Sequence, residues 1–221
     1  MTQGAGSEAF ASGKGHRDEN FPVASFLLKA AYRPPILAFY RFARAADDVA
    51  DHVEASAPEK LAALEAMRAT LTGESDADAP ARALRAVLAT CGLTPRHPLD
   101  LLEAFRRDVT KARYADWDDL LDYCRYSAMP VGRFVLDVHG EDRAVWPLSD
   151  ALCAALQVVN HLQDCAKDSR ALDRVYLPAD LLAAAGARVE DLAAAHAFPP
   201  LRAVIAALAE RTEGLLAESA G

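Results

Sequence analysis

The chain has 221 residues, of which 52% are hydrophobic and 25% charged, an ordinary balance for a globular protein with one sizeable core. Its formal net charge of −8 excludes non-specific binding of nucleic acid, because that binding needs a basic surface. No apolar run approaches the ~20 residues of a membrane-spanning helix, and the N-terminus lacks the apolar segment of a secretory signal. The four cysteines form no C-x-x-C pair, which predicts buried, reduced thiols in a cytoplasmic protein.

Frequent alanine and the lack of alternating apolar patterns predict an all-α bundle of eight or more helices. The Gly- and Ser-rich residues 1–19 are predicted to be mobile, and residues 20–221 to form one helical domain. Capping residues, first-turn prolines and stop signals such as Cys91-Gly92 place the helices. In chain order we expect helices that begin at Asn20 with Pro22, at Pro35 with an end near His52, at Ser56 with an end near Leu71, and over 81–90. The later helices are expected over 98–111, from Asp116 to about His139, from Ser149 to about Asp168, after Pro178, and from Pro199.

Two aspartates one helical turn apart are the first candidates for chemistry. Asp47 and Asp51 share one face of the expected helix 35–52, and Arg44 lies on the same side. Like charges at this spacing repel by about 0.2–0.5 kcal/mol unless something offsets the repulsion. Taken alone, the pair is more simply explained as part of a charged face turned toward solvent.

A second aspartate pair lies in the helix expected over 149–168. Asp164 and Asp168 are again four residues apart, and Asn160 and Gln157 extend the same polar face. The remaining residues of this helix are mostly Leu, Val, Cys and Ala, beside which carboxylates and amides are costly to bury without partners. An exposed polar face on an amphipathic helix is the alternative to a metal-binding face.

Two such helices that face each other across a cavity would suit Mg²⁺. This ion takes oxygen ligands from one or two carboxylates, from water and from a substrate phosphate. A diphosphate bound to the ions becomes a good leaving group, and the carbocation that remains needs a dry, apolar cavity. We therefore predict a magnesium site for a diphosphate substrate, built from the four aspartates.

Five ordered segments make the chain resemble the squalene/phytoene synthase family. They are Asn20–Ser25 at the entry, Phe42–Asp51 and Gln157–Asp168 with the aspartate motifs, Tyr123–Gly132 in a central helix, and Arg174–Pro178 in a loop. Together they span about residues 20–180. Phytoene and squalene synthases usually have Val-Ala-Gly where this chain has Ser127-Ala128-Met129, so the chain looks most like the bacterial hopanoid-pathway branch.

The resemblance implies an isoprenoid synthase-type helical bundle with a central cavity. It implies Mg²⁺-dependent conversion of presqualene diphosphate and water to hydroxysqualene and diphosphate, through rearrangement of a carbocation. Two or three Mg²⁺ ions and no NADPH are expected. The resemblance also allows peripheral contact with the inner face of the membrane and association with other enzymes of the squalene pathway.

The resemblance also implies a role for individual residues. The Mg²⁺ ligands would be Asp47, Asp51, Asp164 and Asp168. Diphosphate or metal-bound water would contact Arg44, Gln157 and Asn160, and further diphosphate-side candidates are Ser25 and Arg174. Tyr123 would lie near the reacting carbons, and Ser127, one turn further along, would help to place the quenching water. The alternatives are a tyrosine with a satisfied hydroxyl, a serine bonded to the carbonyl one turn earlier and, for Arg174, a surface-loop arginine.

The chain departs from the family pattern at two places. Lys167 stands beside the last aspartate, where the family often has an acidic residue. The family normally continues past a helix like 200–218, so C-terminal helices are expected to be missing. Head-to-head condensation of two farnesyl diphosphates to presqualene diphosphate, squalene or phytoene is the second candidate function, and a terpene cyclase or chain-elongating prenyltransferase is the third. A non-catalytic helical module that binds an apolar ligand would explain the core but not the two aspartate pairs.

Overall fold

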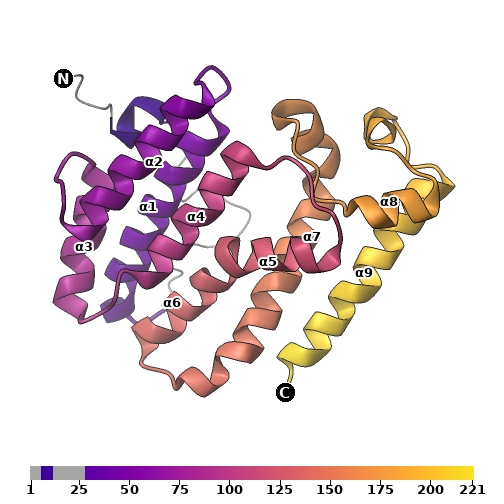
Figure 1. Ribbon diagram of the computed structural model, residues 1–221. Helices are drawn as coiled ribbons and strands as arrows, with labels where there is room; N and C mark the ends of the chain where they lie inside the picture. Colours follow the sequence, from indigo (N-terminus) through magenta and orange to yellow (C-terminus); the bar gives the residue numbers. More distant parts are fainter. Residues whose placement is uncertain (1–5, 12–27) are drawn as a thin grey trace. The chain divides into compact units, whose positions relative to one another are not determined.

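The computed structural model describes residues 6–11 and 28–221 of the chain (Figure 1). In these residues it has nine α-helices, short 3-10 helices and no strand, with one isolated bridge between Arg113 and Val175. The all-α prediction is therefore confirmed. The helix start predicted at Asn20 and Pro22 lies outside the described residues. Contacts within the chain form two compact units, each with its own core.

Unit 1 comprises the described residues up to Val109 together with Phe134–Arg143. Its elements are 3-10 helices at Ser7–Phe10 and Ala30–Tyr32, helices α1 (Arg33–Asp51), α2 (Ala57–Thr72) and α3 (Ala79–Cys91), nearly all of α4 (Arg96–Thr110) and the end of α6 (Met129–His139). Helix α1 packs against α2 and α3, as Figure 1 shows. The core of the unit includes Phe42, Leu64 and Met67.

Local sequence signals explain where the helices of unit 1 begin and end. α1 has Pro34 and Pro35 in its first turn, where a missing N–H costs nothing. Before α2, the Glu59 carboxylate accepts a hydrogen bond from the Ser56 backbone N–H at 2.8 Å, as the predicted capping box requires. α3 ends at Gly92, whose φ of 65° is the left-handed conformation that glycine adopts without strain. These boundaries agree with the sequence within a few residues.

A buried aspartate ties the 3-10 helix Ser7–Phe10 to the start of α3. The Asp78 carboxylate is fully buried and accepts hydrogen bonds from the backbone N–H of Ser7 and of Ala81, both at 2.9 Å, and from the Ser7 hydroxyl. Composition predicts mobility over residues 1–19, but Ser7 is buried and bonded to a residue 71 positions away, a partner that composition cannot reveal.

Unit 2 comprises Thr110–Arg133 and Ala144–Gly221. Its elements are α5 (Trp117–Ser127), the start of α6, a 3-10 helix at Arg143–Val145 that leads in from unit 1, α7 (Trp146–Leu172), α8 (Ala179–Ala185), a 3-10 helix at Val189–Ala193 and α9 (Pro199–Ser219). The long helix α7 is central, since α5, α9 and the 3-10 helix Val189–Ala193 all contact it. Apolar side chains of α8, α9 and the loop after α7 form the core, among them Leu177, Leu182 and Leu208.

Two helix boundaries predicted in unit 2 are wrong. The helix expected from Asp116 to His139 is interrupted at Ala128 (φ −123°, ψ −50°), because Pro130 has no N–H to continue the ladder and instead lies in the first turn of α6. The helix expected to begin at Ser149 begins at Trp146, since Pro147 suits a first turn, and it runs past Asp168 to Leu172.

Gly132 allows the start of α6 to lie close to α7. A Cβ atom at this position would lie 2.5 Å from the Cys153 sulfur and would also meet the Ser149 hydroxyl. We expect Gly132→Ala to lower the free energy of unfolding by about 1–3 kcal/mol, measured by urea denaturation, because both neighbours belong to the packed helix α7. Gly214→Ala in α9 is the matched control, since an added Cβ there meets nothing within 4 Å. That change should stabilise the chain by up to about 1 kcal/mol; equal effects of the two substitutions would contradict the close approach.

The four cysteines, all unpaired, do not share one environment. Burial raises the pKa of the Cys124 thiol to about 12, and it also raises the pKa of the half-buried Cys153 and Cys165. Cys91 is exposed, so the prediction of a buried thiol is wrong for this residue. The reason is its place in the last turn of α3, beyond Leu88, the last core residue of that helix.

Candidate functional site

The first aspartate pair lies near the C-terminal end of α1, where Arg44 contacts two carboxylates. Arg44 Nη1 is 3.1 Å from Asp47 Oδ2, and Nη2 donates a hydrogen bond to Asp48 Oδ1 at 2.8 Å. Asp48 is buried and is not among the residues that the sequence singled out. Its spacing of four residues from Arg44 is the signal that could have identified it.

Burial and neighbouring negative charge raise the pKa of Asp47 to about 7. Desolvation by burial is the largest cause, the negative charge of Asp51 is the next, and the Arg44 guanidinium opposes both. Asp48 and Asp108 add smaller effects in the same direction as Asp51. Such crowding disfavours the ionised carboxyl, and a bound cation would favour it. The donor set at this helix end therefore suits a hard cation such as Mg²⁺.

The second aspartate pair lies on α7, within unit 2. Its polar face is neither fully buried nor fully exposed: Gln157, Asp164 and Asp168 are half-buried and Asn160 is exposed. The Asp164 side chain is 42% exposed, with the Lys167 ammonium 3.8 Å from its carboxylate. The lysine that departs from the family pattern is thus an exposed neighbour of this carboxylate, and Asp164 stays open to solvent.

A buried aromatic cluster, formed by Tyr114, Tyr123, His161 and Tyr176, lies beside this face of α7. The His161 ring stacks on Tyr176 with centroids 3.6 Å apart and an angle of 13°, and its centroid is 5.9 Å from that of Tyr123. Burial, and to a smaller extent the positive charge of Arg174, lowers the pKa of His161 to about 3. The imidazole is therefore neutral at physiological pH.

The aromatic cluster brings together several residues from the sequence analysis. Gln157 Nε2 lies 3.2 Å from His161 Nε2, and Arg174 acts on the same imidazole through its charge. Arg174 is only 8% exposed, so the alternative of a surface-loop arginine is wrong. Sequence reasoning missed His161 and Tyr176, although both lie inside the segments that carry the family resemblance.

The two residues proposed to act near the reacting carbons lie at the end of α5 in unit 2. Tyr123 is buried in the aromatic cluster. The Ser127 hydroxyl oxygen is buried and makes no hydrogen bond to any residue among 6–11 and 28–221. The alternative bond from this hydroxyl to the carbonyl one turn earlier is thus not made. Ser25 lies outside the described residues.

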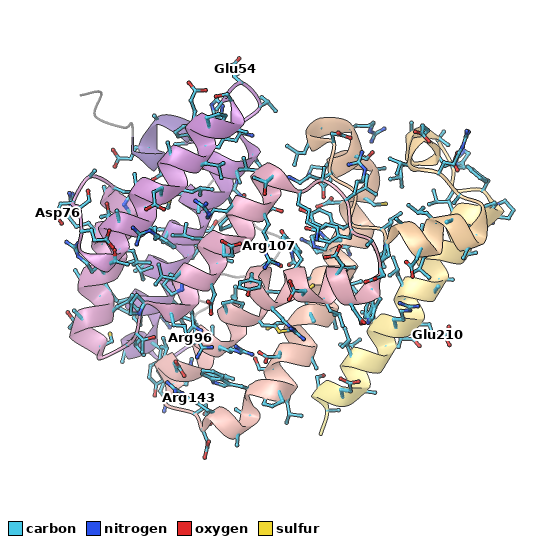
Figure 2. The ribbon with its side chains drawn as sticks, viewed as in Figure 1. Glu54, Asp76, Arg96, Arg107, Arg143 and Glu210 are labelled. Atoms are coloured by element: carbon cyan, nitrogen blue, oxygen red, sulfur yellow. The ribbon has the colours of Figure 1, made fainter. Side chains whose placement is uncertain are left out.

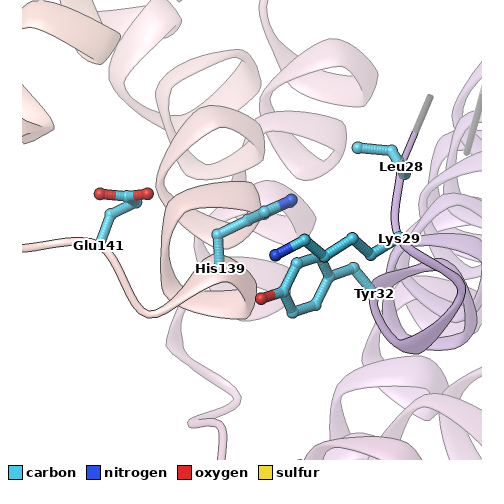
Figure 3. A pocket seen from close by; sticks show the side chains of 5 residues that line it. All are labelled: Leu28, Lys29, Tyr32, His139 and Glu141. Atoms are coloured by element: carbon cyan, nitrogen blue, oxygen red, sulfur yellow. The ribbon is translucent and has the colours of Figure 1, made fainter.

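Some features of the predicted site stay predictions. The first aspartate pair belongs to unit 1 and the second to unit 2, and their placement across a cavity is one of these predictions. Within the described part of the chain, no three His, Cys, Asp or Glu side chains form a metal-binding group, and no helix there has the length and apolarity to cross a membrane. A pocket of about 420 Å³ in unit 1 (Figure 3) contains none of the predicted site residues; it is lined by Leu28, Lys29, Tyr32, His139 and Glu141.

Comparison with known proteins decides the family. The model of the squalene/phytoene synthase family matches residues 15–221. The chain belongs to the squalene/phytoene synthase family. The resemblance drawn from the aspartate motifs, the central helix and the loop after α7 is thereby confirmed.

Two relatives and one solved structure from this family are similar to this chain over most of its length. A protein from Zymomonas mobilis named hydroxysqualene synthase is 60% identical over 215 residues, which cover 96% of this chain and 72% of the relative. Another of the same name from Rhodopseudomonas palustris is 57% identical over 207 residues, covering 94% of this chain and 71% of the relative. A solved structure of a squalene synthase from Alicyclobacillus acidocaldarius has a TM-score of 0.77 and 42% identity, over 90% of this chain and 76% of that chain. The predicted isoprenoid synthase-type fold is confirmed.

Proposed function

We infer that the chain converts presqualene diphosphate and water to hydroxysqualene and diphosphate, a step of hopanoid biosynthesis. The observation that carries this inference is the identity of 57% and 60%, over at least 94% of the chain, to two enzymes named hydroxysqualene synthase. The aspartate pairs on helices α1 and α7 support it, since a diphosphate leaving group calls for bound cations.

The reaction is a substitution at carbon with rearrangement. The carbon–oxygen bond to diphosphate breaks, and its electron pair leaves with the diphosphate. The cyclopropylcarbinyl cation rearranges, and a water oxygen bonds to the cationic carbon and loses a proton. No electrons are gained from outside, so the overall change needs no NADPH.

We propose that Asp47, Asp51, Asp164 and Asp168 hold two or three Mg²⁺ ions. All four supply carboxylate oxygens, which Mg²⁺ prefers, and they recur at a spacing of four residues on each helix. The ion, when bound, would neutralise the diphosphate and assist its departure. Diphosphate or metal-bound water would be contacted by Arg44, Gln157, Asn160, Arg174 and Ser25.

Tyr123 and Ser127 are the residues that we propose to act near the cation. An aromatic face attracts positive charge, which suits Tyr123 to this place. A buried hydroxyl without a partner in the described chain is costly, so the Ser127 oxygen is suited to hold the water that quenches the cation.

Further partners are part of the same proposal. Prenyl diphosphates are the substrates of this family, whereas peripheral membrane contact and association with other squalene-pathway enzymes rest on the apolar nature of the product. A row of exposed apolar side chains on α7 supports a contact with an apolar surface; it consists of Leu148, Leu152, Leu156 and Val159.

Isotopically labelled water tests the reaction directly. With presqualene diphosphate and Mg²⁺, we expect labelled hydroxysqualene in equal yield with and without NADPH, because water rather than hydride ends the reaction. Products are identified by mass spectrometry.

Two other outcomes would contradict hydroxysqualene synthesis. Squalene formed only with NADPH would indicate the reductive reaction, in keeping with the name squalene synthase of the Alicyclobacillus acidocaldarius neighbour. Inert presqualene diphosphate together with consumption of farnesyl diphosphate would indicate head-to-head condensation.

A further inference from the structure

The contact between Gln157 and His161 is a feature of α7 that the aspartate motifs do not explain. The two residues lie four positions apart on one helix face, and their Nε2 atoms are 3.2 Å from each other. With the Gln157 amide nitrogen as the donor, the His161 Nε2 atom is the acceptor. The imidazole then carries its proton on Nδ1.

The imidazole is held in a fixed orientation by its surroundings. It stacks on Tyr176 at 3.6 Å between centroids, lies beside Tyr123 and is 7% exposed. A ring packed in this way cannot turn freely, so the position of its Nε2 acceptor is fixed. A fixed acceptor keeps the Gln157 amide in this orientation, with the nitrogen toward the ring and the carbonyl oxygen on the opposite side.

We propose that His161 is a positioning residue, which holds the Gln157 amide so that its carbonyl oxygen accepts a hydrogen bond from metal-bound water. This proposal rests on the proposed function, since it assigns Gln157 to the water of the magnesium site rather than to a diphosphate oxygen. A diphosphate oxygen needs a hydrogen-bond donor, which the carbonyl oxygen is not. Partners of this kind, one step removed from the ion, commonly change metal affinity.

The tautomer of His161 is the first test and needs no turnover. Two-bond nitrogen–proton correlations by NMR, on the full chain with isotope-labelled histidine, assign the protonated ring nitrogen. We expect the His161 ring to carry its proton on Nδ1 and none on Nε2. In the Gln157→Leu variant, we expect this preference for the Nδ1–H tautomer to be lost. An Nε2–H tautomer in the wild-type chain would overturn the proposal, because the amide would then present its nitrogen to the site.

Magnesium dependence is the second test. His161→Phe keeps a ring to stack on Tyr176 and removes the acceptor, so we expect the half-saturating Mg²⁺ concentration to rise about tenfold. The readouts are turnover of presqualene diphosphate and calorimetric binding of inorganic diphosphate at increasing Mg²⁺. Gln157→Leu should give the same rise, and the double variant no further rise, because both changes remove one interaction. His161→Gln, which restores an acceptor, should recover part of the loss.

A purely structural role would give a different pattern. His161→Phe and Gln157→Leu would then have independent effects that add in the double variant, and this outcome overturns the proposal. His139→Phe is the control, since His139 in unit 1 also contacts a tyrosine ring, that of Tyr32, with centroids 4.2 Å apart and the planes tilted by 51° (Figure 3). It should leave the Mg²⁺ dependence unchanged. A wild-type chain that binds Mg²⁺ and diphosphate but leaves presqualene diphosphate intact would contradict the proposed function alone.

Discussion

Asp164→Asn is expected to lower turnover of presqualene diphosphate by about 100-fold or more while the chain stays folded. The change removes one carboxylate charge from the proposed magnesium site, and charge stabilisation of a leaving group is commonly worth this much. Folding should hold or improve slightly, because Asp164 is 42% exposed and its repulsion from Asp168 one turn away is relieved. Steady-state kinetics and thermal unfolding without Mg²⁺ measure the two effects separately.

Asp122→Asn is a closely matched control for this experiment. Asp122 on α5 is 44% exposed and lies 3.6 Å from an arginine three residues later, much as Asp164 lies 3.8 Å from Lys167. The two aspartates differ in that only Asp164 belongs to an aspartate motif. Turnover of the Asp122 variant should stay within about twofold of the wild-type value, since an exposed ion pair contributes little. Near-wild-type turnover of the Asp164→Asn variant would contradict the proposal that Asp164 is a Mg²⁺ ligand.

Asp78→Ala is expected to cause the largest loss of stability, about 2–4 kcal/mol. The substitution removes the N-cap of α3 and leaves the buried N–H and hydroxyl of Ser7 without their acceptor. Asp78→Asn should lose less, because the amide oxygen can still accept the Ala81 N–H at the helix start. Urea denaturation measures the free energy of unfolding for both variants.

Asp76→Ala is the control for the capping aspartate. Figure 2 labels Asp76 on the loop that leads into α3, where its side chain is 72% exposed and pairs with Arg85. An exposed pair of this kind contributes about 0–1 kcal/mol. If both alanine variants lose the same stability, the buried hydrogen bonds of Asp78 are not what anchors the Ser7–Phe10 helix.

Elements with strong local signals could be predicted from the sequence. The capping box at Ser56 and Glu59, the stop at Gly92 and the proline start of α9 depend on contacts within a few residues. The break at Ala128 could not be placed, because a proline inside a periodic pattern either kinks or ends a helix. The order at Ser7 depends on Asp78, far away in the sequence, so no local pattern predicts it.

In the candidate site, too, local features could be predicted from the sequence and contacts between distant segments could not. The residues of each aspartate motif share a helix face because their spacing matches the helical repeat, which the sequence states directly. The aromatic cluster joins α5, α7 and the segments on either side of them, so Tyr114 and Tyr176 could be grouped with Tyr123 only once the chain was folded. Asp48 pairs with Arg44 four residues earlier, but this spacing alone does not show which of the neighbouring carboxylates the guanidinium contacts.

The uneven burial of the cysteines makes one thiol much easier to label than the others. Thiol reagents react with the thiolate, and burial raises the pKa of Cys124, Cys153 and Cys165, which lowers their thiolate fraction. Cys91 is exposed at the end of α3. A maleimide-linked dye or spin probe would therefore attach first to unit 1, at a position outside both aspartate motifs. Such a probe gives a spectroscopic reference point on native-sequence protein, without prior removal of the other thiols.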